Sequence, residues 1–318
     1  MARICIVTPA RAGSRNGNRH TAQRWAGFLR ALGHRASVMV EWDGEPCDLL
    51  LALHARRSHA SILAFRKLYP HTPLVVTLTG TDLYRDLPDS REARESLRLA
   101  DRVIVLQEDA LRLLRPGIGK KTRIVYQSAK PSVKHSPPRS LFRVAVVGHL
   151  REEKDPFRAG LALAYLDQEL QVVQIGDALS PAMKSQALSL MKRERRYRWL
   201  GGRTHAQALG WIARSHVLVV SSVMEGGANV ISEAARIGTP VLASRVSGNL
   251  GMLGRGYPGY FSLFDEKELG KLIRQSMNDK KYYRSLKSAL TVRRRRFAPS
   301  AERGALAGVV REALRRRA

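Results

Sequence analysis

The sequence predicts an α/β protein with two doubly wound domains, each built on a parallel sheet. Short apolar stretches typical of strands alternate with amphipathic stretches typical of helices, and the alternation restarts after a polar, proline-rich segment at residues 130–140. Such alternation produces right-handed crossovers and parallel strands. The chain has 318 residues, about twice the length of a typical domain. We therefore expect domains at residues 1–134 and 135–300, and a last helix at residues 301–318 that packs back on the first domain.

The expected elements of the first domain follow from hydrophobic periodicity. Trp25, Leu29 and Leu32 recur at helical spacing ahead of Gly33, and glycine is favoured just after the last turn of a helix. The apolar runs between such stretches are expected to be strands. Strands are expected at residues 4–8, 37–40, 48–52, 74–78, 102–106 and 124–126, and helices at residues 19–32, 62–68, 91–99 and 109–114.

The second domain repeats the pattern, and the C-terminal third is mainly helical. Strands are expected at residues 142–147, 170–175, 217–221 and 240–243, and helices at residues 156–166, 183–191, 204–215 and 229–237. Two sheets of this kind face each other across a cleft formed at the carboxyl ends of their strands. Ligands of doubly wound proteins bind at those ends.

The charge balance is strongly basic, with 55 Lys and Arg against 27 Asp and Glu and a formal net charge of +28. Three interpretations compete: binding to nucleic acid, attachment to an anionic membrane face, and a cleft for small anionic substrates. Aromatic residues make up only 6% of the chain and do not alternate with basic ones, which disfavours nucleic acid as a partner. Arginines also occur on nearly every expected helix, so small anionic substrates are the preferred partners.

The cysteine content and the length of the apolar runs limit which cellular compartment the protein is expected to occupy. Cys5 and Cys47 are the two cysteines, too few for a disulfide framework or a cysteine-based metal site. No apolar run approaches the roughly 18 residues that a membrane span needs. The apolar stretch after Met1 ends at Pro9 and is interpreted as a first strand rather than a signal peptide. We therefore expect a cytoplasmic protein without stable membrane insertion, and no metal cofactor.

The most informative motif is SSVMEGGANVISEA at residues 221–234. It follows an apolar strand and enters a helix at about Asn229, where backbone N–H groups and the helix dipole favour an anion. The glycines allow a ligand to approach the backbone. Glu233, about one turn inside the helix, has a carboxylate that can accept both hydroxyls of a sugar diol. A plain glycine turn with a helix-stabilising glutamate explains the pattern equally well.

A second motif, GHLREEKDP at residues 148–156, leaves the first strand of the second domain. Arg151 and Lys154 are three residues apart, so both can point at one ligand. A guanidinium and an ammonium there could bind a diphosphate and stabilise the charge that develops on it as it leaves. The alternative is a pair of exposed loop cations that form ion pairs with the neighbouring acids at residues 152, 153 and 155.

Together the two motifs resemble the donor site of the retaining glycosyltransferase family 4. The similarity extends to WLGG at residues 199–202, SHVLVVSS before Glu225 and GTPVLAS after the helix. The family has the GT-B fold of two Rossmann-like domains around a cleft. The resemblance implies that Arg151 and Lys154 hold the donor diphosphate, that Glu225 faces the sugar, and that no metal is needed. The remaining donor contacts that it implies are Gly148, Gly201, Arg203, Gly226, Gly227, Ala228, Asn229, Val230 and Glu233, the last binding the ribose hydroxyls.

The first domain resembles one subgroup of that family, the selenosugar synthases of selenoneine biosynthesis. The matching segments are ARAGSRNGNRHTAQRWAGFLRALGH and TLTGTDLYRDL in the first domain, together with SRVSGNLGMLG at residues 244–254 in the second. The resemblance implies transfer of a sugar from UDP-N-acetylglucosamine or UDP-glucose to selenophosphate. The implied acceptor contacts are Arg15, Asn16, Gly17, Asn18, Arg19, His20, Thr79, Gly80, Thr81 and Asp82. A lipid, polysaccharide or small-molecule hydroxyl acceptor is the alternative within the family.

One position departs from the family pattern. Many relatives carry a histidine before Gly-Thr-Asp, where this chain has Thr79. Such a histidine usually contacts the donor sugar or assists the chemistry. Selenophosphate is already ionised and needs no general base, unlike a sugar hydroxyl. The threonine therefore favours a pre-ionised acceptor.

Overall fold

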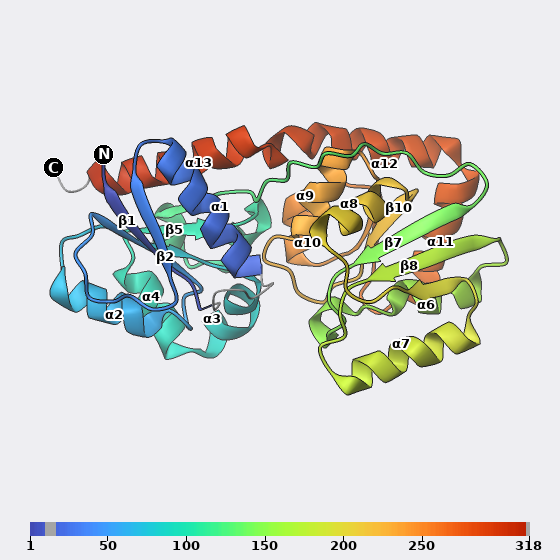
Figure 1. Ribbon diagram of the computed structural model, residues 1–318, viewed down its shortest axis with the longest axis horizontal. Coiled ribbons are helices and arrows are strands. Elements are labelled where there is room, and N and C mark those ends of the chain that lie inside the picture. The colour runs from blue at the N-terminus through green and yellow to red at the C-terminus, as the bar shows by residue number, and fades with distance from the viewer. Residues whose placement is uncertain (10–16, 316–318) are drawn as a thin grey trace. The chain divides into compact units, whose positions relative to one another are not determined.

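The computed structural model describes residues 1–9 and 17–315, which form two compact units (Figure 1). The first unit comprises Met1–Gln127 with the C-terminal helix that begins at Pro299, and the second comprises Ser128–Ala298. The sequence predicts these boundaries a few residues later, at residues 134 and 300. Each unit contains one six-stranded sheet in which every strand pair is parallel. The two parallel sheets predicted from the alternation are confirmed.

The sheet of the first unit has the strand order β2-β1-β3-β4-β5-β6. Its strands are β1 (Arg3–Val7), β2 (Arg35–Met39), β3 (Leu49–Leu53), β4 (Leu74–Thr77), β5 (Arg102–Val105) and β6 (Thr122–Ile124). Its α-helices are α1 (Gly17–Ala31), α2 (His59–Leu68), α3 (Leu87–Asp89), α4 (Arg91–Leu99), α5 (Pro116–Lys120) and α13 (Pro299–Arg315). A π-helical turn at Asp82–Asp86 and a 3-10 helix at Glu108–Leu113 complete the unit.

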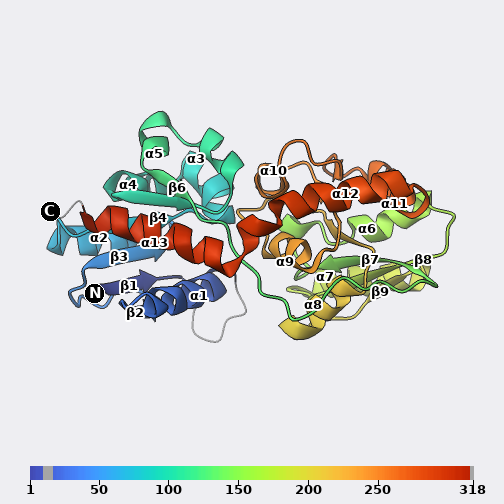
Figure 2. The same cartoon turned by 90° about the horizontal axis from the view of Figure 1, so that it is seen from above.

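Helices cover both faces of this sheet, which explains why β3 is apolar and buried along its whole length. Leu49, Leu51 and Leu53 belong to the core on the side of α1 and α13, whereas Leu50 and Ala52 belong to the core on the side of α2 and α4. Figure 2 shows α13 crossing over β3 beside α1, and α13 is in contact with both elements. The C-terminal helix therefore supplies part of the core of the first unit.

The sheet of the second unit has the strand order β12-β11-β10-β7-β8-β9. Its strands are β7 (Phe142–Val147), β8 (Leu170–Ile175), β9 (Tyr197–Trp199), β10 (Val217–Val220), β11 (Val241–Ser244) and β12 (Tyr260–Phe261). Its α-helices are α6 (Arg158–Leu161), α7 (Pro181–Arg193), α8 (His205–Ala213), α9 (Asn229–Ile237), α10 (Ser247–Leu253), α11 (Glu266–Asn278) and α12 (Lys280–Arg293). Short 3-10 helices lie at Glu152–Lys154, Ala162–Tyr165 and Arg294–Phe297.

Two expected α-helices are wrong in detail. The segment expected as a helix at residues 109–114 is a 3-10 helix, because Pro116 holds Arg115 in an extended conformation and leaves room only for tight turns. The helix expected at residues 156–166 is a single α-turn that tightens into a 3-10 helix. Its Gly160 packs against Leu190 and Tyr197, and a glycine inside a helix weakens it.

The sequence reasoning also missed several short elements. Among them are β9, β12, α3, α5, α10 and the π-helical turn at Asp82–Asp86. The last strand of the first unit lies at Thr122–Ile124 rather than at residues 124–126. Within the part of the chain that the structure describes, none of the helices has the length and apolarity needed to cross a membrane.

Candidate functional site

The carboxyl ends of β7 and β10 mark the point where the strand order of the second sheet reverses. β7 pairs with β8 on one side and with β10 on the other. In an open parallel sheet the loops that leave two such strands splay apart, and ligands bind between them. The loop after β7 carries residues 148–155 and the loop after β10 carries residues 221–228. The two motifs that stand apart in the sequence are therefore neighbours in the fold.

An ion pair joins these two loops. The Lys154 ammonium contacts Glu225 Oε1, and Ser222 Oγ donates a hydrogen bond of 2.7 Å to the same oxygen. The Glu225 side chain is 8% exposed and the Lys154 side chain is 24% exposed. Leaving either charge alone at this depth would be unfavourable, so each holds the other in place. An anionic ligand that reaches Lys154 would compete with Glu225 for it.

Hydrogen bonds from one loop to the backbone of the other fix their relative positions. The Val223 N–H donates to the Glu153 carbonyl at 3.0 Å, and Ser221 Oγ donates to the Asp155 carbonyl at 2.7 Å. Asp155 has a φ of 41°, in the left-handed region, and it ends the 3-10 turn that carries Lys154. Arg158 Nε lies 2.8 Å from Asp155 Oδ2 and secures this turn.

Arg151 and Lys154 differ in their surroundings. Arg151 Nε lies 3.9 Å from Glu153 Oε2, and the arginine side chain is 46% exposed. The alternative of cations paired with neighbouring acids therefore describes Arg151, through a long and exposed contact of little energetic weight. Lys154 instead pairs across the site with Glu225. Of the two, Lys154 is the cation that contacts the loop leading from β10 to α9.

A cavity of about 20 Å³ lies beside the Lys154–Glu225 pair, with space for about one water molecule. Its lining includes Gly148, Pro156, Gln174, Ser221, Ser222 and Val230 in addition to the pair. Because the cavity is small, a larger ligand would lie over these loops and fill the cavity only with one of its groups.

Gly248, at the start of α10, permits a close approach to Glu225. A Cβ at this position would lie 1.8 Å from the Glu225 carbonyl oxygen and 2.6 Å from its Cβ. Real Cβ contacts essentially never fall below 3.0 Å. Only glycine therefore fits against the Glu225 backbone, and α10 packs directly on that residue. Gly248 is not among the site residues that the sequence predicts.

The N-terminus of α9 follows the Gly226-Gly227 turn. Ala228 precedes the helix and has no hydroxyl or carboxylate with which to cap it. The N–H groups of Ile231 and Ser232 donate to the Ala228 carbonyl. The N–H groups of the residues before them have no carbonyl within the helix to which they could donate. An uncapped N-terminus of this kind favours an anion, through its N–H groups and the helix dipole.

Glu233, one turn inside α9, contacts a residue that the sequence reasoning missed. His205 Nε2 lies 2.8 Å from Glu233 Oε1, and this hydrogen bond raises the pKa of His205. The His205 side chain is 73% exposed and that of Glu233 is 14% exposed. Gly201 reaches a φ of 69° in the turn ahead of His205, and Arg203 in the same turn is exposed. His205 and Glu233 lie in different helices, so the sequence alone does not indicate that they form a pair.

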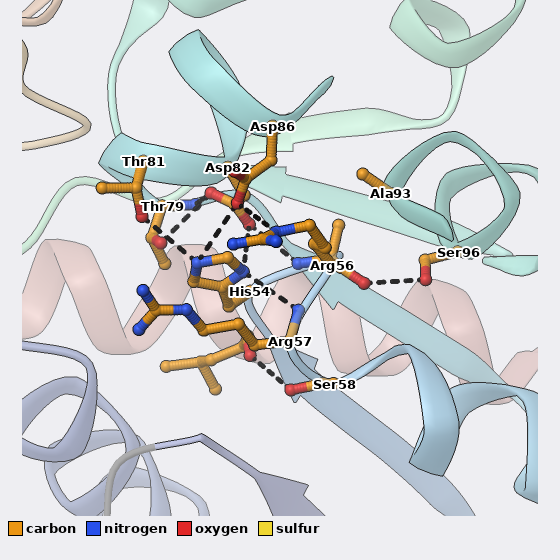
Figure 3. Close-up of polar contacts among 12 residues, drawn as sticks. His54, Arg56, Arg57, Ser58, Thr79, Thr81, Asp82, Asp86, Ala93 and Ser96 are labelled. Carbon is orange, nitrogen blue, oxygen red and sulfur yellow. Dashed lines mark hydrogen bonds and ion pairs between the residues drawn. The ribbon is translucent and has the colours of Figure 1, made fainter. Parts of the chain in front are cut away.

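The predicted acceptor residues lie in the first unit, where Thr79–Asp82 leave the carboxyl end of β4 (Figure 3). The Asp82 side chain is fully buried, and it accepts hydrogen bonds from the Thr79 N–H at 2.5 Å and the Ala55 N–H at 2.8 Å. Burial raises the pKa of the Asp82 carboxyl to about 7, although these N–H donors lower it. In this arrangement the Asp82 carboxyl organises the loop through its hydrogen bonds. Gly80 and Thr81 are both partly exposed.

Four of the remaining predicted acceptor residues begin α1. Gly17, Asn18, Arg19 and His20 form its first turn, and Thr21 Oγ1 donates to the Gly17 carbonyl at 2.9 Å. Arg15 and Asn16 lie outside the described residues. Among residues 1–9 and 17–315, no group of three or more His, Cys, Asp or Glu side chains is placed to hold a metal ion.

Solved structures share the fold of nearly the whole chain. HepE from Anabaena in complex with UDP-glucose has a TM-score of 0.78 and 16% identity, and the match covers 98% of this chain and 100% of that one. Sucrose-phosphate synthase from Thermosynechococcus elongatus has a TM-score of 0.79 and 17% identity, with 98% and 99% covered. The lipopolysaccharide outer core galactosyltransferase WaaB has a TM-score of 0.73 and 16% identity, with 98% and 99% covered. These likenesses confirm the predicted GT-B fold of two Rossmann-like parallel-sheet domains.

Sequence comparison identifies the family. No curated protein sequence matches the chain significantly. The model of the family "glycosyl transferases group 1" matches residues 130–291, just over half of the chain. The matched region contains both loops of the candidate site. The chain therefore belongs to the glycosyl transferases group 1 family.

Proposed function

We propose that this glycosyltransferase transfers a sugar from a UDP-sugar, UDP-N-acetylglucosamine or UDP-glucose, to selenophosphate. The observation that carries the donor half is the Lys154–Glu225 pair beside the uncapped start of α9, at the reversal point of the second sheet. HepE, which shares the fold, was solved in complex with UDP-glucose. The acceptor half rests on the resemblance of the first domain to the selenosugar synthases.

In this proposal the donor lies over the two loops of the second unit. Its diphosphate is held by Arg151, Lys154 and the N–H groups at the start of α9, and Glu233 accepts the ribose hydroxyls. The sugar then lies next to Glu225. These cations and helix dipoles neutralise the charge that grows on the diphosphate as it leaves, so we propose that no metal is required.

The chemistry is a substitution at the anomeric carbon followed by a hydrolysis. Selenium of selenophosphate forms a bond to C1 of the sugar while the bond between C1 and the UDP oxygen breaks, and UDP leaves with the electron pair. Water then cleaves the selenium–phosphorus bond, which gives the 1-selenosugar and inorganic phosphate. The nucleophile carries its own negative charge, so positioning contributes more than general-base catalysis.

The test is incubation of the enzyme with each UDP-sugar and selenophosphate, with UDP release followed by chromatography and the product by mass spectrometry. We expect a selenium-bearing sugar that depends on both substrates. UDP release without a selenosugar would refute the acceptor assignment and leave the family assignment intact.

Lys154→Ala tests the diphosphate role separately. Loss of a partly buried, charge-assisted contact to the leaving group is expected to lower turnover about 100-fold or more. Lys192→Ala, at an exposed position of α7, is the matched control and should keep normal turnover. Near-normal turnover of Lys154→Ala, with the fold intact, would rule out the proposed role.

A groove in the first unit favours a second candidate, an acceptor that has an apolar body. The groove measures about 790 Å³, within the range of small-molecule sites. Its lining includes Leu83, Tyr84, Leu87, Leu97, Leu114 and Ile118, with Arg91, Arg94, Arg98 and Arg115. In this candidate function the acceptor is an amphipathic alcohol with an anionic group. Glycosylation of such an alcohol in place of selenophosphate would support it.

A further inference from the structure

The turn that follows β3 lies at the reversal point of the first sheet. β1 pairs with β2 on one side and with β3 on the other, so the loop after β3 leaves the sheet where ligands of doubly wound domains bind. The loop after β3 is the turn at residues 54–58. The same rule applied to the second sheet leads to the Lys154 and Glu225 loops. None of the motifs identified in the sequence includes residues 54–58.

His54 gives this turn an unusual conformation. Its φ is 75°, in the left-handed region that side chains other than glycine rarely adopt. The residue is fully buried, so its surroundings hold it in this conformation. Strained residues of this kind concentrate at functional sites. Figure 3 shows the His54 ring in contact with both the turn and the Thr79–Asp82 loop.

The two ring nitrogens of His54 connect those loops. Nδ1 accepts a hydrogen bond of 3.3 Å from the Arg57 N–H, which leaves the hydrogen on Nε2 for the Thr81 hydroxyl at 3.2 Å. Burial, followed by the charge of Arg57, lowers the pKa of His54 to about 4, so the ring is neutral near pH 7. Neutral His54 therefore fixes the backbone of Arg57 and the side chain of Thr81 relative to each other.

The two arginines of the turn have different electrostatic environments. Arg56 Nε lies 3.0 Å from Asp86 Oδ2. Arg57 is exposed, and among the described residues its side chain has no hydrogen bond or ion pair to a carboxylate. Residues 10–16 contain no acid. In Figure 3 the Arg57 side chain passes beneath the His54 ring, and its guanidinium ends on the side of Thr79 and Thr81.

We propose that Arg57 and the Thr81 hydroxyl bind the phosphoryl oxygens of the acceptor, and that His54 is the positioning residue that sets their spacing. The inference rests on the proposed function for the identity of the acceptor, and on the first unit alone for the oxyanion site. A planar guanidinium can donate two parallel hydrogen bonds to a phosphoryl group. Because the Thr81 oxygen accepts from His54 Nε2–H, its own hydrogen is left to donate a third hydrogen bond to a phosphoryl oxygen.

The first test compares Arg57→Ala, Arg57→Lys and wild-type enzyme in selenosugar formation. Loss of a charge-assisted contact should raise the KM for selenophosphate about 10- to 100-fold, with the Kd for UDP unchanged. Arg57→Lys should fall between, because lysine keeps the charge and loses the bidentate geometry. Arg35→Ala, an exposed arginine at the amino end of β2 in the same unit, is the matched control. A wild-type KM in Arg57→Ala would overturn the inference.

A second measurement separates this inference from the proposed function. Binding of inorganic phosphate, followed by phosphorus NMR with UDP present in excess, needs no turnover. Arg57→Ala should weaken it about 10-fold or more, and Arg35→Ala should not. Equal phosphate affinity in Arg57→Ala and wild type would overturn the oxyanion site. Failure of wild type to form a selenosugar would refute the proposed function, and the phosphate titration would then decide the oxyanion site alone.

His54 is tested by two substitutions. Asparagine tolerates the left-handed region better than alanine and keeps a hydrogen-bonding group. His54→Ala should raise the KM for selenophosphate while the Kd for UDP stays unchanged, and His54→Asn should restore most of the loss. A lower melting temperature in His54→Ala with a wild-type KM would show a purely structural role and overturn the assignment.

Discussion

The replacement Gly248→Ala tests whether the position of Glu225 controls the reaction. The added Cβ would lie 1.8 Å from the Glu225 carbonyl oxygen, and the shortest separation that real Cβ atoms show is 3.0 Å. The two segments must therefore separate by about 1.2 Å. A misplacement of about 1 Å costs about 100-fold in rate when it disturbs the geometry of reacting groups. We expect turnover to fall about 100-fold.

The substitution also strains the packing, which should destabilise the second unit by about 1–3 kcal/mol. That is too little to unfold a protein of ordinary stability. The assay is UDP release at saturating UDP-sugar and acceptor, together with the Kd for UDP and a thermal melt. Gly256→Ala, a few residues beyond α10, has open space around the new Cβ and should behave as wild type. Turnover of Gly248→Ala within about threefold of wild type would refute a role for the α10–Glu225 contact, because the clash cannot be relieved without movement.

Two further predictions concern the first unit. His54 is neutral in the folded state down to pH about 4, whereas its ordinary value is 6.5, so the unfolded state alone binds a proton between these values. The contribution of His54 to the free energy of unfolding is therefore lost as pH falls from 6.5 to 4, by about 3 kcal/mol. In urea unfolding, the difference in free energy of unfolding between wild type and His54→Asn should decrease by that amount. Glu302, buried in α13, pairs with Arg24 and accepts from Trp25 Nε1 at 2.7 Å. Glu302→Ala should cost about 3–5 kcal/mol in the same experiment, and Glu302→Gln less.

The sequence predicted those parts of the fold that depend on local periodicity. Fully apolar β3 and the amphipathic α4 and α9 appear close to their expected positions, because burial on one or both faces leaves a repeat in the residue types. Short elements such as β12 carry no repeat long enough to detect. The 3-10 helices share the composition of α-helices, and tertiary packing decides between the two.

The candidate site was predictable as two loops but not as one arrangement. Lys154 and Glu225 are 71 positions apart, and only the strand order that pairs β7 with β10 makes them contact. The same holds for His205 with Glu233 and for Gly248 with Glu225. None of these contacts follows from spacing in one segment, because each depends on which strands are neighbours in the sheet.

The basic composition makes an unpaired arginine a weak signal on its own. With 55 basic residues and 27 acids, many cations lack an acidic partner wherever they lie. Arg57 is distinguished by the turn that carries it. A buried histidine is held at a φ of 75°, one of its ring nitrogens accepts from the Arg57 backbone, and the neighbouring Arg56 is already paired with Asp86. Backbone strain that fixes the Arg57 backbone and the Thr81 hydroxyl through one histidine needs compensation elsewhere in the fold. A solvated surface cation would not require a strained backbone. A cation that must bind an oxyanion in a fixed geometry would require one.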